Sequence, residues 1–151
     1  NEPVISYDLL PTLADIAGAT DALPNELDGR SIRPVLKNPD IKIQRPSDGL
    51  VFHFPHYNVL GLNEPHSAIR IGDYKLLKFT SCERGLLFNV ADDPSESEDL
   101  YEANIALAGK LNTELESYLD AVGAEKPEDS NSWKNGRSGA TKTLFLSRYP
   151  K

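Results

Sequence analysis

The chain has 151 residues and a 39% apolar fraction, values typical of one folded domain of ordinary size. Its 16 lysines and arginines against 23 aspartates and glutamates give a net charge of −7, which argues against nucleic-acid binding and against a basic membrane-surface mode. A single cysteine, Cys82, excludes an internal disulfide framework and a cysteine-built zinc site, and no apolar run approaches the roughly 20 residues of a spanning helix.

The first part of the chain predicts two short helices and a linker. Apolar residues recur at helical spacing over residues 6–17, and Gly18 is a natural stop. A second short helix is expected over residues 32–36, with Pro34 in its first turn. Residues 38–49 carry two prolines and no hydrophobic period, which is typical of a linker. The apolar stripe of the first helix consists of Leu9, Leu10, Leu13 and Ile16, followed by Ala17.

Four strands are predicted next, over residues 50–54, 67–71, 74–79 and 86–90. In the first strand Phe52 and Phe54 share one face, while Val51 and His53 share the other. The short Gly72-Asp73 connection predicts a hairpin between the second and third strands. Asp92-Asp93-Pro94 closes the fourth strand as a turn.

A long amphipathic helix over residues 103–122 is the clearest element, and Gly123 ends it. Residues 126–139 are polar, and residues 143–146 are either one more strand or part of an ordered tail. Antiparallel strands followed by a helix predict an α+β fold, a roughly four-stranded antiparallel sheet with the long helix packed on one face. The helix stripe consists of Leu107, Leu111, Leu115, Tyr118, Leu119 and Val122.

Histidines beside aromatic residues mark the candidate site. His53 and His56 lie in the segment FHFPHY, and His66 follows within ten residues. Imidazoles at a strand end are able to bind an anion, shuttle a proton or ligate a metal, and they equally serve as structural hydrogen-bonding groups. His56 is the stronger candidate because it follows the strand, in a loop, where sites usually lie. Three metal ligands are not visible together here.

The remaining polar residues favour structural roles. Cys82 has no local base and is interpreted as inert. The acidic residues from 92 to 99 lack the spacing of a calcium loop and are interpreted as a capped turn and a solvated face. Arg70 and Lys75 are expected to pair with a local carboxylate rather than to bind an anionic ligand. The residues alone therefore predict a small acidic α+β domain with a polar site near His56.

Five segments, read in order, resemble the C-terminal part of a sulfatase of the alkaline-phosphatase superfamily. They cover residues 4 to 122, and the tail from residue 126 matches no segment of the family. The segments are DLLPTL with IAGA (8–13 and 16–19), LDGRSIRPVL (27–36), FHFPHY (52–57), SAIRIGDYKLL (67–77) and LFNV with its following acidic turn (87–100).

The resemblance implies a division of the chain. Residues 1–45 would be the end of an α/β catalytic domain, residues 46–125 a C-terminal α+β subdomain, and residues 126–151 an extension of unknown structure. The family's nucleophile arises from Cys or Ser followed by x-Pro-x-Arg and oxidised to formylglycine, whereas Cys82 is followed by Glu-Arg-Gly-Leu. The family's calcium ligands have no match here either. The chain is therefore expected to be a C-terminal fragment, inactive alone, with no catalytic residue or metal ligand of its own.

The longer polypeptide, called the parent protein below, is expected by this resemblance to hydrolyse sulfate esters of carbohydrates, with calcium and formylglycine upstream. This segment would close one side of the substrate pocket, with His56, His53 and Tyr57 reaching the sulfate or the sugar. The resemblance implies a periplasmic or secreted location. The apolar stripe of the first helix would face the absent domain, so the isolated fragment is expected to self-associate or to reposition that helix.

Two alternatives stay open on the sequence. The segment would also suit a phosphodiesterase or phosphonate hydrolase of the same superfamily, and the upstream nucleophile separates these from a sulfatase. A free-standing carbohydrate- or protein-binding module is the other alternative.

Overall fold

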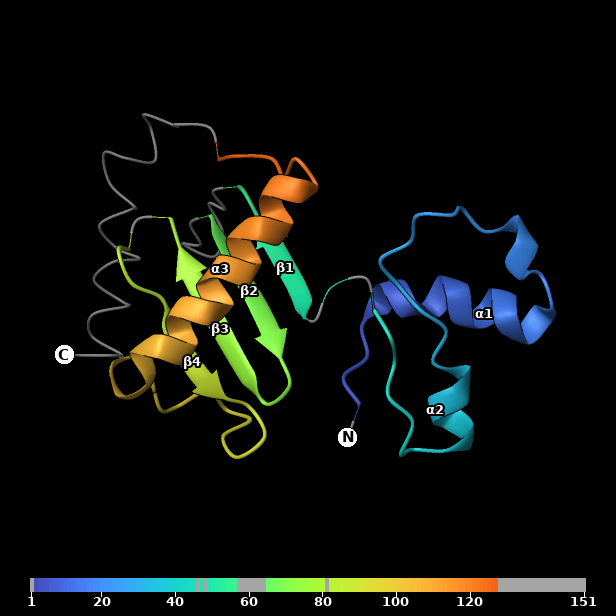
Figure 1. Ribbon diagram of the computed structural model, residues 1–151, viewed down its shortest axis with the longest axis horizontal. Helices are drawn as coiled ribbons and strands as arrows, with labels where there is room; N and C mark the ends of the chain where they lie inside the picture. The colour runs from blue at the N-terminus through green and yellow to red at the C-terminus, as the bar shows by residue number, and fades with distance from the viewer. Residues whose placement is uncertain (1, 46, 48, 57–64, 81, 128–151) are drawn as a thin grey trace. The chain divides into compact units, whose positions relative to one another are not determined.

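The computed structural model describes residues 2–45, 47, 49–56, 65–80 and 82–127. It forms two compact units, unit 1 from Asn1 to Leu50 and unit 2 from Val51 to Lys151 (Figure 1). Tyr57, the segment 143–146 and most of the predicted extension lie outside the described residues.

Unit 1 contains the two predicted helices. The first starts with a 3-10 turn, η1 (Ser6–Asp8), and continues as α1 (Leu9–Ala17). Gly18 ends α1 with a φ of 70°, a left-handed conformation that glycine adopts without steric cost. A further 3-10 turn, η2 (Thr20–Ala22), precedes α2 (Arg33–Lys37), which begins one residue later than predicted.

A buried ion pair holds the linker of unit 1 against the start of α1. The Asp8 side chain is 1% exposed and that of Arg45 is 8% exposed. Arg45 Nη1 and Nη2 donate to the two carboxylate oxygens of Asp8 at 2.6 and 2.7 Å. The backbone N–H groups of Ile5 and Arg30 also donate to this carboxylate, both at 3.0 Å. The two buried charges are therefore paired and hydrogen-bonded, as burial in a folded protein requires.

The segment before α2 is attached to α1 by further polar contacts. Thr12 Oγ1 donates to the carbonyl of Asp8 and accepts from the backbone N–H of Ile32. At Gly29 a Cβ atom would overlap the carbonyl oxygen of Tyr7, so only glycine allows this close approach. Polar groups rather than an apolar core thus fix the inner side of α1.

Unit 2 contains a four-stranded antiparallel sheet in the order β1-β2-β3-β4. The strands are β1 (Leu50–Phe54), β2 (His66–Ile71), β3 (Tyr74–Phe79) and β4 (Leu86–Asn89). The predicted hairpin is present, because the β2–β3 register runs from Ile71 opposite Tyr74 to His66 opposite Phe79.

The long helix α3 (Ile105–Ala121) covers one face of this sheet, after a 3-10 turn, η3 (Glu102–Asn104) (Figure 1). The predicted α+β fold is confirmed. One predicted stripe residue is wrong: Val122 lies just beyond α3 and is 55% exposed. The core under the helix consists of Ile69, Leu76, Leu87, Ala108, Leu111 and Leu115.

The chain that follows β4 covers the free edge of that strand. The Leu100 N–H donates to the Leu87 carbonyl at 2.7 Å, and the Leu87 N–H donates to Asp99 Oδ1 at 3.0 Å. Asp99 also pairs with Arg84 at 2.6 Å. The outer backbone groups of Leu87 are satisfied in this way, which protects an edge strand from pairing with another chain.

Candidate functional site

An aromatic and histidine cluster joins the end of β1, the start of β2 and the end of β3. The His66 ring lies 5.5 Å from the Phe54 ring and 5.6 Å from the Phe79 ring. His56, three residues beyond His53, meets the edge of Phe54 at 5.8 Å and an interplanar angle of 83°. The structure thus places His56 in a cluster with His66, across Phe54.

His56 itself is exposed. Its ring makes an edge contact with the ring of Phe54. An exposed imidazole is suited to hydrogen-bonding an incoming anion or hydroxyl group.

His66 was not among the residues predicted to form the site. The hairpin was the available signal, because a turn at Gly72-Asp73 sets His66 directly opposite Phe79. The contact of His66 with Phe54 depends on the pairing of β1 with β2, which no local pattern indicated.

His53 points to the other face of β1 and has its own partners. Its Nδ1 lies 2.8 Å from Ser67 Oγ, and its Nε2 lies 2.8 Å from the backbone oxygen of Glu125. Because a carbonyl only accepts, Nε2 carries a proton and donates to Glu125. Nδ1 then accepts from the Ser67 hydroxyl in the neutral ring, or donates to it in the charged ring. His53 therefore joins β1 and β2 to the chain that follows α3.

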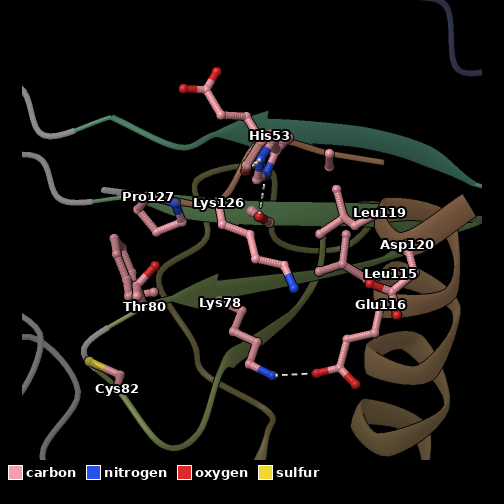
Figure 2. A pocket seen from close by; sticks show the side chains of 14 residues that line it. His53, Lys78, Thr80, Cys82, Leu115, Glu116, Leu119, Asp120, Lys126 and Pro127 are labelled. Atoms are coloured by element: carbon pink, nitrogen blue, oxygen red, sulfur yellow. Dashed lines mark hydrogen bonds and ion pairs between the residues drawn. The ribbon is translucent and has the colours of Figure 1, made fainter. Parts of the chain in front are cut away.

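A cavity of about 440 Å³ opens beside His53, between the sheet and the C-terminal half of α3 (Figure 2). This volume falls within the range of small-molecule pockets. Leu115 and Leu119 of α3 supply apolar wall, while Lys78 and Thr80 come from β3 and the residue after it. Lys126 enters the cavity from the chain after α3.

One ion pair crosses the cavity wall. Lys78 Nζ lies 2.8 Å from Glu116 Oε1 and donates to Asn112 Oδ1 at 2.9 Å. Hydrogen bonds from Lys78, and to a lesser extent from Asn112, hold the pKa of Glu116 below its ordinary value. Burial acts in the opposite direction, and its effect on this pKa is smaller. The Lys78 charge is thereby neutralised within the wall.

The other polar residues have structural partners. Lys75 pairs with Glu96 at 2.7 Å, as predicted, whereas Arg70 donates to the backbone oxygen of Gly72 and has no carboxylate partner among the described residues. The Asp93 carboxylate accepts from the N–H groups of Ser97 and Glu98, so it caps the predicted turn. Glu96 and Asp99, expected on a solvated face, are both ion-paired instead.

The described residues do not fit the family's metal or nucleophile. No group of three or more His, Cys, Asp or Glu side chains in the described ranges is placed to hold a metal ion. Cys82 is half-buried, and the Glu-Arg-Gly-Leu that follows it does not match Cys-x-Pro-x-Arg. Among the described helices, none has the length and apolar character needed to cross a membrane.

Comparison with known proteins decides the family. The family described as N-sulphoglucosamine sulphohydrolase, C-terminal, matches residues 1–129. The chain belongs to this family of sulfatase C-terminal domains. A sulfatase of Formosa agariphila is 35% identical over 130 residues, which covers 78% of this chain and 23% of that protein. The chain therefore spans about a quarter of the length of this relative.

Two solved structures extend the comparison. One, described as bound to its substrate D-glucosamine-2-N,6-O-disulfate, is 25% identical with a TM-score of 0.60, and covers 75% of this chain and 23% of that one. The phosphonate monoester hydrolase of Agrobacterium radiobacter is 22% identical with a TM-score of 0.50, covering 73% of this chain and 23% of that one. The second likeness shows a shared fold alone, so the fold does not separate sulfate from phosphonate hydrolysis.

Proposed function

We propose that this chain is the C-terminal portion of a sulfatase that hydrolyses sulfate esters of carbohydrates. The observation that carries the proposal is the family match over residues 1–129. The 35% identity to a sulfatase supports the reaction, and the similarity to a structure bound to a sulfated glucosamine supports the substrate class.

In this proposal the reacting groups come from the upstream part of the parent protein. Calcium and formylglycine are assigned there, because the described residues here fit neither. The present chain supplies binding surface and is inactive alone. The parent acts in the periplasm or outside the cell, and its partner is the sulfated carbohydrate.

The chain's part is to close one side of the substrate pocket, with His56 as the direct contact. His56 is exposed, and its ring contacts the edge of Phe54. Its imidazole nitrogens would hydrogen-bond the sulfate or a sugar hydroxyl. Tyr57, outside the described residues, is proposed to join it by stacking on a sugar ring. His53 belongs to the same site as a supporting residue, since both of its nitrogens already hold partners.

The reaction is tested with the parent protein and three probes: D-glucosamine-2-N,6-O-disulfate, 4-nitrophenyl sulfate and a phenylphosphonate monoester. We expect sulfate release from the sugar with a kcat/KM at least about a hundredfold above that for the phosphonate, which corresponds to about 2.7 kcal/mol of transition-state discrimination. Preferred cleavage of the phosphonate would contradict the proposal. Cleavage of only the aryl sulfate would keep the sulfatase and reject the carbohydrate.

The pocket role is tested by His56→Ala in the parent protein. We expect kcat/KM for the sulfated sugar to fall by more than about tenfold, since about 1.4 kcal/mol of binding to a charged group is lost. Arg70→Ala is the matched control, because Arg70 lies near the far end of β2 and contacts Gly72. A change within about twofold for His56→Ala, worth roughly 0.4 kcal/mol, would reject the pocket role.

A further inference from the structure

The sheet of unit 2 carries a second apolar cluster on the face opposite α3. Leu76 and Leu87 pack under the helix. Because successive side chains of a strand point to opposite faces, Leu77, Leu86 and Phe88 point away from it. Leu86 and Phe88 are the buried members of this second cluster, which contains no residue of α3.

The second cluster is closed over β4 and open over β1. Leu86 is 3% exposed and Phe88 is 1% exposed, whereas Phe52 of β1 is 47% exposed. Strand neighbours lie beside such side chains, so burial this complete on a sheet face requires a further layer of chain above them. Beyond the strands, the described residues that pack against the cluster are Cys82 and Val90, each within three residues of a strand end. They lie at its rim, so another segment of the chain is needed to cover it.

The C-terminal extension has the length and the apolar content that this layer needs. Residues 128–151 lie outside the described residues and belong to unit 2 by sequence range. They contain the run Thr-Leu-Phe-Leu at residues 143–146, followed by Tyr149. The connection over residues 128–142 spans up to roughly 50 Å when extended, whereas neighbouring strands lie only about 4.8 Å apart. The apolar run is therefore able to reach either face of the sheet from the end of α3.

Charge complementarity favours the β4 side of this face. Residues 130–151 carry five lysines and arginines and no acidic residue, although the net charge of the chain is −7. Residues 92–102, which follow β4, carry six acidic residues and no basic one. Lys75 and Arg84 pair with Glu96 and Asp99 of this segment, so an excess of negative charge remains beside the buried end of the cluster. Opposite charges of this kind select the position and orientation of a docked segment.

We propose that residues 143–149 of this chain dock on the sheet face opposite α3, over Leu86 and Phe88, as a third layer of unit 2. The leucine and phenylalanine side chains of the run cover the second cluster, and the basic residues that flank it lie toward the acidic segment after β4. The inference concerns the chain's own packing and does not depend on the reaction of the parent protein.

The reactivity of Cys82 tests this docking, because this single thiol packs against the second cluster. Its rate of alkylation by iodoacetamide is measured in the 151-residue chain and in the double variant Leu144→Asp with Phe145→Asp. These two positions point to opposite sides of an extended segment, so one of them faces the sheet in either orientation. We expect the double variant to react at least about tenfold faster, because burying a carboxylate opposes docking and the thiol reacts when the segment is undocked. Ser138→Asp with Thr141→Asp adds the same charge to a polar part of the extension and should change the rate by less than about twofold.

A second measurement uses the wild-type chain and needs no variant. Nuclear Overhauser effects should connect the ring protons of Phe88 with side chains of Leu144, Phe145 or Leu146. Effects that connect Phe88 only with residues outside 128–151 would overturn the proposal, as would equal Cys82 rates in the wild type and the double variant. A wild-type rate that rises on dilution would place the extension of a second copy on this face and overturn docking within one chain.

Discussion

Unit 1 and unit 2 bury opposite kinds of side chain. In unit 1 the buried side chains include the charged Asp8 and the polar Thr12, at 1% and 5% exposure. In unit 2 they include Leu76, Leu87 and Phe88, none more than 1% exposed. The apolar stripe of α1 is correspondingly turned outward, with Leu9, Leu10, Leu13 and Ile16 between 55% and 63% exposed.

This difference shows that the described residues of unit 2 enclose an apolar core, whereas unit 1 exposes the apolar stripe of α1. Four neighbouring apolar side chains on one helix form a patch of the kind that soluble proteins normally cover. The chain spans about a quarter of its sulfatase relative, so the upstream polypeptide is the covering partner that we propose. In this proposal the polar contacts of Asp8 and Thr12 keep α1 in position to bind the upstream polypeptide.

The largest expected effect comes from breaking the buried Asp8–Arg45 pair, which should destabilise unit 1 and leave unit 2 folded. Asp8→Ala leaves the Arg45 guanidinium buried without its partner, and breaking a buried pair in this way costs about 3–5 kcal/mol. Hydrogen exchange of the 151-residue chain should show the amides of α1 losing protection while those of β3 keep theirs. Asp15→Ala, which removes a partly exposed pair with Arg33, should cost about 1 kcal/mol or less. Loss of amide protection in both α1 and β3 would contradict the prediction that the Asp8–Arg45 pair stabilises unit 1 alone.

Leu87→Ala is the matching change in unit 2. Leu87 is fully buried under α3, and truncation of such a leucine costs about 2–5 kcal/mol through lost transfer energy and a new cavity. Urea unfolding followed by circular dichroism measures the loss. Leu36→Ala, at a side chain that is 67% exposed, should change the free energy of unfolding by less than about 0.5 kcal/mol. Similar losses for both variants would mean that unit 2 lacks the closed core described above.

Acid should weaken unit 1 before unit 2. Burial raises the pKa of Asp8, but the hydrogen bonds from Arg45 and from the Arg30 and Ile5 N–H groups outweigh burial and leave it below the ordinary value. A lowered carboxyl pKa contributes stability that is present above the unfolded pKa of about 3.9 and is lost as the pH falls through the folded pKa. In unit 2 the pKa is lowered for the carboxyl groups of Asp93 and Glu116. Their hydrogen bonds are exposed to solvent, so they contribute little to the free energy of unfolding. Denaturant titrations at pH 6 and pH 3 should therefore show an earlier transition for unit 1 at the lower pH. Equal sensitivity of the two units would show that the Asp8 pair is not what holds unit 1.

The smallest effect on folding is expected at the apolar stripe itself. Leu10→Glu with Leu13→Glu alters exposed positions, so the free energy of unfolding should change by about 0.5 kcal/mol or less per site. Sedimentation should nevertheless show wild-type chain that self-associates and a double variant that is monomeric, because the shared surface is apolar. Ile105→Glu, at an apolar side chain of unit 2 that is 60% exposed, should leave association unchanged. A monomeric wild-type chain would count against self-association.

Sequence patterns predicted the elements well because each carries a local signal. The period of Leu107, Leu111 and Leu115 placed α3, and Gly72-Asp73 placed the hairpin. The Asp8–Arg45 pair was not predicted, since 37 residues separate its members and no local pattern joins them. The partners of His53 were missed for the same reason, because Glu125 follows it by 72 residues. Long-range polar contacts depend on the packed fold, which spacing along the chain does not encode.

The central claim is that an upstream catalytic domain completes this chain, and reading the coding frame upstream of Asn1 tests it most directly. The account predicts a continuous frame that carries Cys or Ser followed by x-Pro-x-Arg, together with acidic metal ligands. A frame that carries a Thr or Ser nucleophile outside this motif would favour the phosphonate hydrolase alternative. A start codon directly before Asn1 would contradict the account, because the apolar stripe of α1 would then have no upstream partner.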